Sequence, residues 1–230
     1  MAKQKEKTVW FCNECGADSP KWVGRCPACG AWNTMVEERV APKSADSWSG
    51  SPRKGGIVQR TSPQRVSEIK AGDETRIHMP SEELNRVLGG GLVSGSMVLV
   101  GGEPGIGKST LVLQNILSIK SRRILYVSGE ESPQQIRMRA DRIGRLSDNC
   151  YIVTETSLEN IFEHIREIEP QLLIVDSIQT VASDALESAA GSVSQVRECA
   201  ARLLRYAKTE NVPVLLIGHI NKEGTLAGPK

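Results

Sequence analysis

The segment from Gly101 to Thr110 reads GGEPGIGKST, and the rest of the chain is organised around it. From Gly102 to Ser109 it follows the Walker A pattern G-x-x-x-x-G-K-S, in which glycines allow backbone N–H groups to surround phosphates. In such a loop Lys108 reaches the β- and γ-phosphates, and the Ser109 hydroxyl binds magnesium. The sequence therefore predicts that ATP and Mg²⁺ are bound here, with ATP held by Gly102, Glu103, Pro104, Gly105, Ile106, Gly107, Lys108, Ser109 and Thr110.

The residues on either side of this loop support the prediction. A continuous apolar run from Met97 to Val100 predicts a buried strand before it, and apolar residues at helical spacing predict a helix after it: Leu111, Leu113, Ile116 and Leu117. The positive end of that helix dipole would face the phosphates. A strand followed by a loop and a helix favours a nucleotide site over a plain glycine-rich turn.

The composition narrows the class of protein. The chain has 230 residues, of which 39% are hydrophobic and only 4% aromatic, so its main core must be aliphatic. Basic residues are concentrated before the loop: residues 39–76 carry eight Lys or Arg against four Asp or Glu, whereas residues 77–230 carry sixteen against eighteen. No apolar run approaches the roughly 18 to 20 residues of a membrane span, and no signal peptide is evident. We expect a cytoplasmic protein without a membrane partner.

Four cysteines near the start form two C-x-x-C pairs, and they predict a metal site. Cys12 and Cys15 are separated by ten residues from Cys26 and Cys29, a spacing typical of a four-cysteine zinc site. Two disulfides are the alternative, which the absence of a signal peptide disfavours. We expect residues 1–38 to form a small zinc ribbon whose folding free energy comes mainly from the metal, on the order of 10 kcal/mol.

Aromatic residues are concentrated in the same segment: Trp10, Phe11, Trp22 and Trp32. We expect them to pack around the ribbon, because so small a domain needs apolar cover. A second interpretation remains open, in which these rings stack on nucleic-acid bases beside Lys21 and Arg25.

The next segment, residues 39–66, has the composition of a flexible basic linker. It contains Pro42, Pro52 and Pro63 among many Ser, Gly and basic residues, and it cannot bury a core. Its basic residues could contact a phosphate backbone, although a solvated linker is the simpler interpretation.

Residues 67–230 read as an α/β core. Buried strands are predicted at 97–100, 124–127, 151–153, 172–175 and 214–217, and helices at 81–87, after the Walker A loop, and from residues 132, 156 and 192. Capping boxes are predicted for Ser132 with Gln135 and for Thr156 with Glu159, and Ser192 with Gln195 is expected to cap the last helix. Apolar strands that alternate with helices predict a parallel sheet covered on both faces.

The polar residues that follow these strands should meet at one edge of the sheet, because parallel strands share their carboxyl ends there. Asp176 ends an apolar run and would hold magnesium, although a turn or helix cap is the alternative. Glu130 is our preferred base for activating water, with Glu131 orienting it; a surface ion pair is the alternative. His219 could sense the γ-phosphate or be a buried core histidine.

Together these motifs resemble a known superfamily. The segments LGGGLVSG (88–95), GGEPGIGKST (101–110), SGEES (128–132) and GHINKEG (218–224) resemble the RecA-like ATPases. With the ribbon in front, the order from Cys12 to Lys230 is similar to that of the bacterial RadA (Sms) family of DNA repair proteins. The resemblance implies a magnesium ATPase that forms a homo-hexamer and binds single-stranded DNA. It also implies a helicase that drives branch migration of recombination intermediates beside a RecA-type recombinase.

The resemblance also marks two segments as DNA-binding loops. Residues 183–191 correspond to the first loop and residues 221–230 to the second, where Lys222 and Lys230 are available for phosphates. Solvated loops are the competing interpretation.

Members of that family continue beyond the fifth strand with a KNRFG motif and a Lon-protease-like domain, which this sequence does not contain. We therefore expect a C-terminally truncated core, either an N-terminal fragment or the product of an interrupted gene. Ring ATPases take a cationic finger from the neighbouring subunit, and the KNRFG motif would supply such cations. We expect this chain to bind ATP, to hydrolyse it weakly and to assemble poorly.

Two other functions remain open. One is a nucleotide-dependent switch ATPase of the KaiC type, and the other is a fragment that only binds nucleotide. The ribbon and the basic linker favour the DNA-dependent ATPase, because a switch needs neither.

Overall fold

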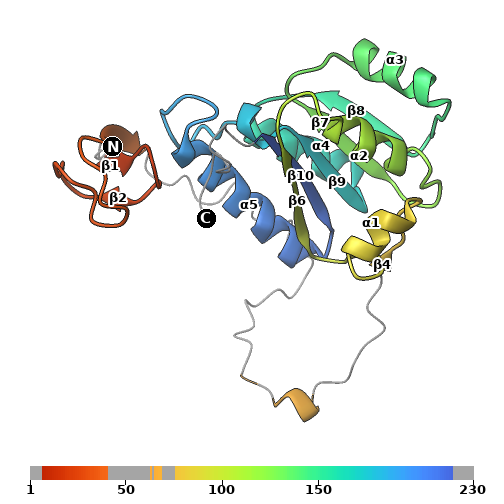
Figure 1. Ribbon diagram of the computed structural model, residues 1–230, viewed down its shortest axis with the longest axis horizontal. Coiled ribbons are helices and arrows are strands. Elements are labelled where there is room, and N and C mark those ends of the chain that lie inside the picture. Colours follow the sequence, from red (N-terminus) through yellow and green to blue (C-terminus); the bar gives the residue numbers. More distant parts are fainter. Residues whose placement is uncertain (1–6, 41–62, 64, 69–75, 220–230) are drawn as a thin grey trace, which may run out of the picture.

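The computed structural model describes residues 7–40, 63, 65–68 and 76–219, which form a small ribbon and a larger α/β core (Figure 1). Most of the predicted linker lies outside the described residues; its last residue, Val66, begins the short 3₁₀ helix η1 (Val66–Glu68). In the ribbon, β1 (Lys7–Cys12) pairs antiparallel with β2 (Asp18–Ser19) and β3 (Met35–Val40). The strand β3 therefore extends past the boundary predicted at residue 38.

The core contains a five-stranded sheet in the order β6-β10-β9-β7-β8, and every neighbouring pair is parallel. Its strands are β6 (Met97–Gly102), β7 (Ile124–Ser128), β8 (Cys150–Thr154), β9 (Leu172–Asp176) and β10 (Val214–His219). The five predicted strands and their parallel arrangement are thus confirmed. The prediction that all five are buried is wrong for the edge strands β6 and β8, which are only partly buried.

Helices cover both faces of this sheet (Figure 1). Successive strand residues point to opposite faces, so Ile124 and Tyr126 pack with α2 (Lys108–Ile116) and α3 (Pro133–Ile143). Leu125 and Val127 pack on the other face with α4 (Leu158–Ile168) and α5 (Val193–Glu210). The central strands are consequently buried on both sides, as continuous apolar runs predict.

The segment before β6 contains the helix predicted at residues 81–87 and a two-stranded hairpin that the sequence analysis does not predict. Strand β4 (Arg76–Ile77) pairs antiparallel with β5 (Leu92–Val93), and α1 (Glu82–Val87) lies between them in the chain. Asn85 fixes this unit, since its Oδ1 accepts from the Met79 N–H at 2.8 Å and its Nδ2 donates to the Met79 carbonyl at 2.6 Å. A carboxylate at this position could not make both bonds.

The ends of the helices test the predicted caps. The capping box of Ser132 and Gln135 is present at the start of α3, where both reciprocal hydrogen bonds form. The box predicted for Thr156 and Glu159 is wrong, because Ser157 caps α4 instead. The Glu159 carboxylate instead contacts residues distant in sequence, because its Oε1 accepts from the Ser183 hydroxyl at 3.0 Å and pairs with Arg202.

The segment predicted as the first DNA loop, residues 183–191, is held by one buried side chain. Gln195, with only 1% of its surface exposed, accepts from the Ser183 N–H at 2.8 Å through Oε1. Its Nε2 donates to the carbonyls of Ser183, Leu186 and Ser188 at 3.0 to 3.1 Å. Ser192 caps α5 as predicted, but the Gln195 side chain folds the preceding loop rather than completing a box.

The ribbon contacts the core at the start of α5. Arg197 Nη1 donates to the Gly16 carbonyl at 2.7 Å, and Val193 lies against the same glycine. Among the described residues, no helix has the length and apolar character needed to span a membrane.

Replacing Phe162 with alanine should lower the free energy of unfolding of the core by about 3–5 kcal/mol, because the ring is 1% exposed and a cavity would remain. Urea unfolding followed by far-UV circular dichroism measures this loss. The exposed neighbour substitution Glu163→Ala is the control and should change the value by less than about 0.5 kcal/mol. Equal effects of the two variants would contradict the packing of α4 described here.

Candidate nucleotide and metal sites

The carboxyl ends of four strands lie side by side and define the candidate nucleotide site. In the strand register, Ile217 of β10 pairs with Asp176 of β9 and Ser128 of β7 pairs with the same Asp176. On the other side of β10, His219 pairs with Gly102, the first residue of the Walker A loop. The sheet therefore brings together the predicted residues of the loop, β7, β9 and β10.

The Walker A loop has the backbone that its glycines predict. Gly107 adopts φ 93° and precedes the first residue of α2, Lys108. Residues with side chains rarely adopt such positive φ angles, so glycine is required where the loop turns into the helix. Ser109 and Thr110 lie in the first turn of α2, where free N–H groups and the helix dipole favour an anion.

Lys108 lies across this loop and is only 6% exposed. Its Nζ donates to the carbonyl oxygens of Gly102 at 2.8 Å and Glu103 at 2.7 Å, and it lies 3.2 Å from His219 Nδ1. All three acceptors are neutral when Nδ1 is unprotonated, so they orient the ammonium without cancelling its charge. A phosphate could therefore compete for the same protons.

Glu130 follows β7 and faces the end of β9. Its Oε1 accepts from the Ser177 hydroxyl at 2.9 Å and lies 3.5 Å from His219 Nε2. The backbone after β7 can approach the segment after β9 because residue 129 is glycine, since a Cβ there would lie 1.9 Å from Thr180 Oγ1. The Glu130 side chain remains 51% exposed, so it can contact a ligand.

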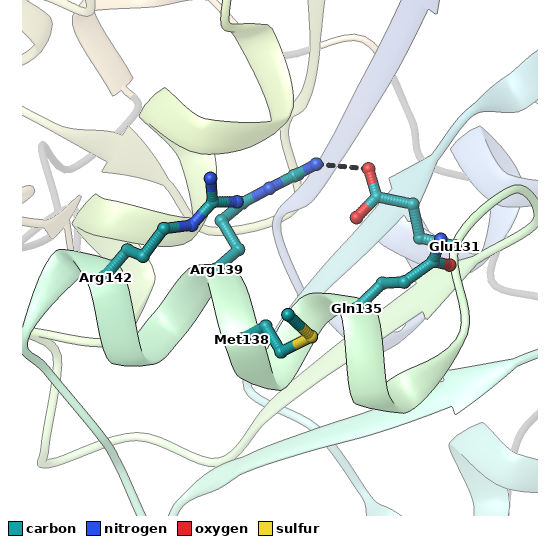
Figure 2. A pocket seen from close by; sticks show the side chains of 5 residues that line it. All are labelled: Glu131, Gln135, Met138, Arg139 and Arg142. Atoms are coloured by element: carbon teal, nitrogen blue, oxygen red, sulfur yellow. Dashed lines mark hydrogen bonds and ion pairs between the residues drawn. The ribbon is translucent and has the colours of Figure 1, made fainter.

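Glu131 has a different environment from its neighbour. Its carboxylate pairs with Arg139, which reaches across from α3 (Figure 2). The two side chains are 29% and 19% exposed, so the pair is largely shielded from water. The charge of Glu131 is thereby balanced, whereas Glu130 faces a hydroxyl and an imidazole.

A hollow of 280 Å³ lies beside this ion pair (Figure 2) and is lined by Glu131, Gln135, Met138, Arg139 and Arg142. Four of these residues belong to α3, and the fifth, Glu131, pairs with that helix. None belongs to the Walker A loop, so the hollow adjoins the candidate nucleotide site through Glu131 alone.

Asp176 ends β9 and is held by Tyr126, whose hydroxyl donates to Oδ2. Burial, together with the Asp176 charge, raises the pKa of Tyr126, so the phenol remains a protonated donor. Carboxylate and hydroxyl oxygens are the ligands that Mg²⁺ prefers, and Asp176 with Ser109 provides both types. Their donor chemistry suits Mg²⁺, and the magnesium site itself stays a prediction.

The four ribbon cysteines converge as predicted. Their Sγ atoms all lie within 4.8 Å of one another, with 3.7 Å between Cys12 and Cys29 and 3.6 Å between Cys15 and Cys26. A tetrahedron with Zn–S bonds of about 2.3 Å has edges of about 3.8 Å, so these separations fit zinc. All six cysteines of the chain are free, which excludes the disulfide alternative for this structure.

Backbone donors prepare one of these sulfurs for metal binding. The Cys29 N–H lowers the pKa of the Cys26 thiol to about 6, with a smaller contribution from the Ala28 N–H. A lowered pKa favours the thiolate, which is the form that binds zinc.

The ribbon aromatics only partly follow the packing prediction. Trp10 packs beside the buried Cys12, Cys26 and Met35. Trp22 and Trp32, by contrast, are 54% and 69% exposed, so the expectation that they cover the ribbon core is wrong. The zinc-bound knuckles are too small to bury four aromatic side chains.

Three side chains at the site are missing from the sequence prediction: Tyr126, Arg139 and Ser177. Tyr126 is the one residue with a polar side chain inside the run Ile124–Val127, and a buried hydroxyl requires a partner, which is the signal that could have found it. Arg139 and Ser177 carry no such signal, because their partners come from other elements. Lys222 and Lys230, predicted to contact DNA, lie outside the described residues.

Comparisons with known proteins identify relatives of both parts of the chain. A family described as an AAA domain matches residues 63–225. A second family, described as a rubredoxin metal binding domain, matches residues 10–37 and so covers the four-cysteine cluster.

Whole-chain relatives confirm the resemblance predicted from the sequence. DNA repair protein RadA of Halalkalibacterium halodurans is 50% identical over 229 residues, which are 98% of this chain and 49% of that protein. DNA repair protein RadA of Bacillus subtilis is 49% identical over 232 residues, covering 100% and 50%. That of Escherichia coli is 46% identical over 235 residues, covering 100% and 50%. The chain thus spans about half the length of these relatives.

Among solved structures, a KaiC-like protein of Pyrococcus horikoshii matches with a TM-score of 0.51 and 21% identity, covering 66% of this chain and 74% of that one. At this identity the likeness bears on the fold alone, and it agrees with a RecA-like α/β core.

Removing zinc with a chelator should unfold the ribbon and leave the core folded, because the sulfurs are the centre of the ribbon's small core while the sheet has its own. The four tryptophans all lie in residues 1–48, so their fluorescence reports on the ribbon and linker, and far-UV circular dichroism reports mainly on the core. Cys26→Ser should reproduce the fluorescence change, whereas the matched substitution Cys199→Ser, outside the cluster, should not. Loss of the core signal together with zinc would contradict separate stabilisation.

Proposed function

Because the chain belongs to the AAA domain family, we propose that it binds ATP with magnesium at the carboxyl edge of its sheet and hydrolyses it in response to single-stranded DNA. The observation that carries this proposal is Lys108, whose ammonium is buried in the Walker A loop and held only by neutral acceptors. A buried, uncompensated positive charge requires an anion, and a polyphosphate supplies it.

Each neighbouring side chain has a role in this proposal. Ser109 and Asp176 hold Mg²⁺, and Glu130 accepts a proton from the attacking water. The imidazole of His219, on β10, lies between Lys108 and Glu130. Loss of the γ-phosphate would therefore alter the contacts of His219 with both Lys108 and the base Glu130. Glu131, neutralised by Arg139, fixes the loop after β7 and thereby orients Glu130.

The wider role follows from the relatives, which are named DNA repair proteins. We infer that the longer protein is a homo-hexameric, cytoplasmic helicase that drives branch migration of recombination intermediates beside a RecA-type recombinase. Because this chain spans about half of those relatives, these activities and partners belong to the proposal for the longer protein. The ribbon and basic linker favour DNA over the signalling function of a switch ATPase.

The test is steady-state ATP turnover of the zinc-loaded chain, measured with and without single-stranded DNA. Turnover should rise with DNA and disappear in Lys108→Ala, which should also lose affinity for ADP. The exposed lysine substitution Lys120→Ala is the matched control and should leave both quantities unchanged. Turnover that ignores DNA would favour the switch ATPase, and unchanged ADP affinity in Lys108→Ala would refute the nucleotide site.

The two glutamates can be separated by isosteric substitution. Glu130→Gln should keep ATP affinity and lower turnover about 10²- to 10⁴-fold, because an amide accepts no proton from water. Glu131→Gln should lower turnover less, since it weakens only the pairing with Arg139. The measurements are ATP affinity and single-turnover hydrolysis. If Glu131→Gln abolishes hydrolysis while Glu130→Gln does not, Glu131 is the base.

A further inference from the structure

The second zinc knuckle presents two indole rings to solvent. Trp22 and Trp32 are 54% and 69% exposed, in a chain whose residues are only 4% aromatic. Neither indole belongs to the buried ribbon core, and both lie in or beside the hairpin that carries Cys26 and Cys29. Exposed rings of this size on so small a ribbon mark it as a candidate interaction site.

Both rings are fixed against the knuckle. The Trp22 ring lies against Gly24, where a Cβ would be 3.4 Å from Trp22 Cη2. The Trp32 ring lies under the Arg25 guanidinium, 5.7 Å from ring centroid to Cζ, within the range of a cation–π interaction. Arg25 is itself held, because its Nε donates to the Gly30 carbonyl at 2.9 Å.

The backbone of this hairpin is tied to the metal-binding residues. Arg25 and Trp32 form an antiparallel bridge, and the Asn33 N–H donates to the Gly24 carbonyl at 2.9 Å. The bridge encloses Cys26 and Cys29, so the cysteine cluster lies in the same hairpin that carries Trp32, and Trp22 packs against Gly24 of that hairpin. Rigid aromatic side chains lose little conformational entropy when they bind.

The charge of this surface selects its partner. Residues 19–34 contain two basic residues, Lys21 and Arg25, both exposed, and no Asp or Glu. The loop at residues 183–191, expected from the sequence to contact DNA, has the opposite character, with Asp184 and Glu187 and no Lys or Arg. Of these two surfaces, the ribbon is therefore the one suited to a polyanion.

We propose that the second knuckle binds single-stranded DNA through the exposed side chains of Lys21, Trp22, Arg25 and Trp32, with bases stacked on the indoles and phosphates paired with the cations. This deepens the proposed function and rests on its DNA substrate. Duplex DNA does not fit, because its bases are already stacked on one another. Stacking on aromatic rings with basic flanks is the general mode of sequence-independent single-strand binding.

The test is a titration of the zinc-loaded chain with a short oligothymidylate, followed by intrinsic tryptophan fluorescence. Stacking should quench the fluorescence, and an abasic strand of equal length, with the same phosphates, should bind more weakly and quench little. Trp22→Ala and Trp32→Ala should each raise Kd about fivefold or more. Trp32→Phe should retain most of the affinity, and Trp10→Phe, whose ring packs inside the ribbon, should retain all of it.

Zinc content is measured for each variant, so that a lost ribbon is not mistaken for lost stacking. Unchanged Kd in both zinc-loaded alanine variants would overturn the inference, and so would equal binding of the abasic strand. If the wild-type chain does not bind the oligothymidylate at all, the inference is also overturned, and a protein becomes the expected partner of the two rings. If both alanine variants keep their DNA-stimulated ATP turnover and an unchanged Kd, the proposed function is supported and the stacking inference is rejected. Base-dependent quenching without any stimulation of turnover would support the stacking surface and reject the DNA-coupled ATPase.

Discussion

The pairing of β10 between β6 and β9 is the contact on which the site depends. This strand is the last in the described core, yet it bonds to the first strand of the sheet on one side and to β9 on the other. Its residues Val214–Ile217 are almost completely buried and contribute to both hydrophobic cores. Without β10, neither His219 nor the end of β9 would lie beside the Walker A loop.

Charge is distributed unevenly over the residues that this pairing assembles. Glu131 and Arg139 neutralise one another in a shielded ion pair. Lys108 donates to carbonyl oxygens and lies beside an imidazole nitrogen, with no carboxylate among these contacts, and in a region of low dielectric its attraction for phosphate is strong. The site therefore has one balanced pair that fixes its geometry and one unbalanced cation that is available to a ligand.

The ribbon and the core are stabilised in different ways. The core buries aliphatic side chains on both faces of a sheet, and the hydroxyl of its buried Tyr126 donates to Asp176. The buried cluster of the described ribbon consists of Cys12, Cys26 and Met35 alone, so the four sulfurs and the metal they would bind must hold its shape. A metal-centred fold leaves its aromatic side chains free for the surface, which is why Trp22 and Trp32 can serve a partner.

The sequence by itself determined the features that depend on neighbouring residues. The Walker A loop between a strand and a helix, the two cysteine knuckles, the positions of the five strands and the Ser132 capping box all follow from local pattern, because their geometry is fixed by spacing and backbone preference. The predicted capping box of Thr156 and Glu159 failed because distant groups bind the Glu159 carboxylate, which accepts from Ser183 and pairs with Arg202. The prediction also failed for Trp22 and Trp32, because burial depends on how much core a fold can offer. Only the tertiary structure decided which glutamate is neutralised, what holds Lys108 and how Gln195 folds the loop before α5, since each of these contacts joins elements that are far apart in the chain.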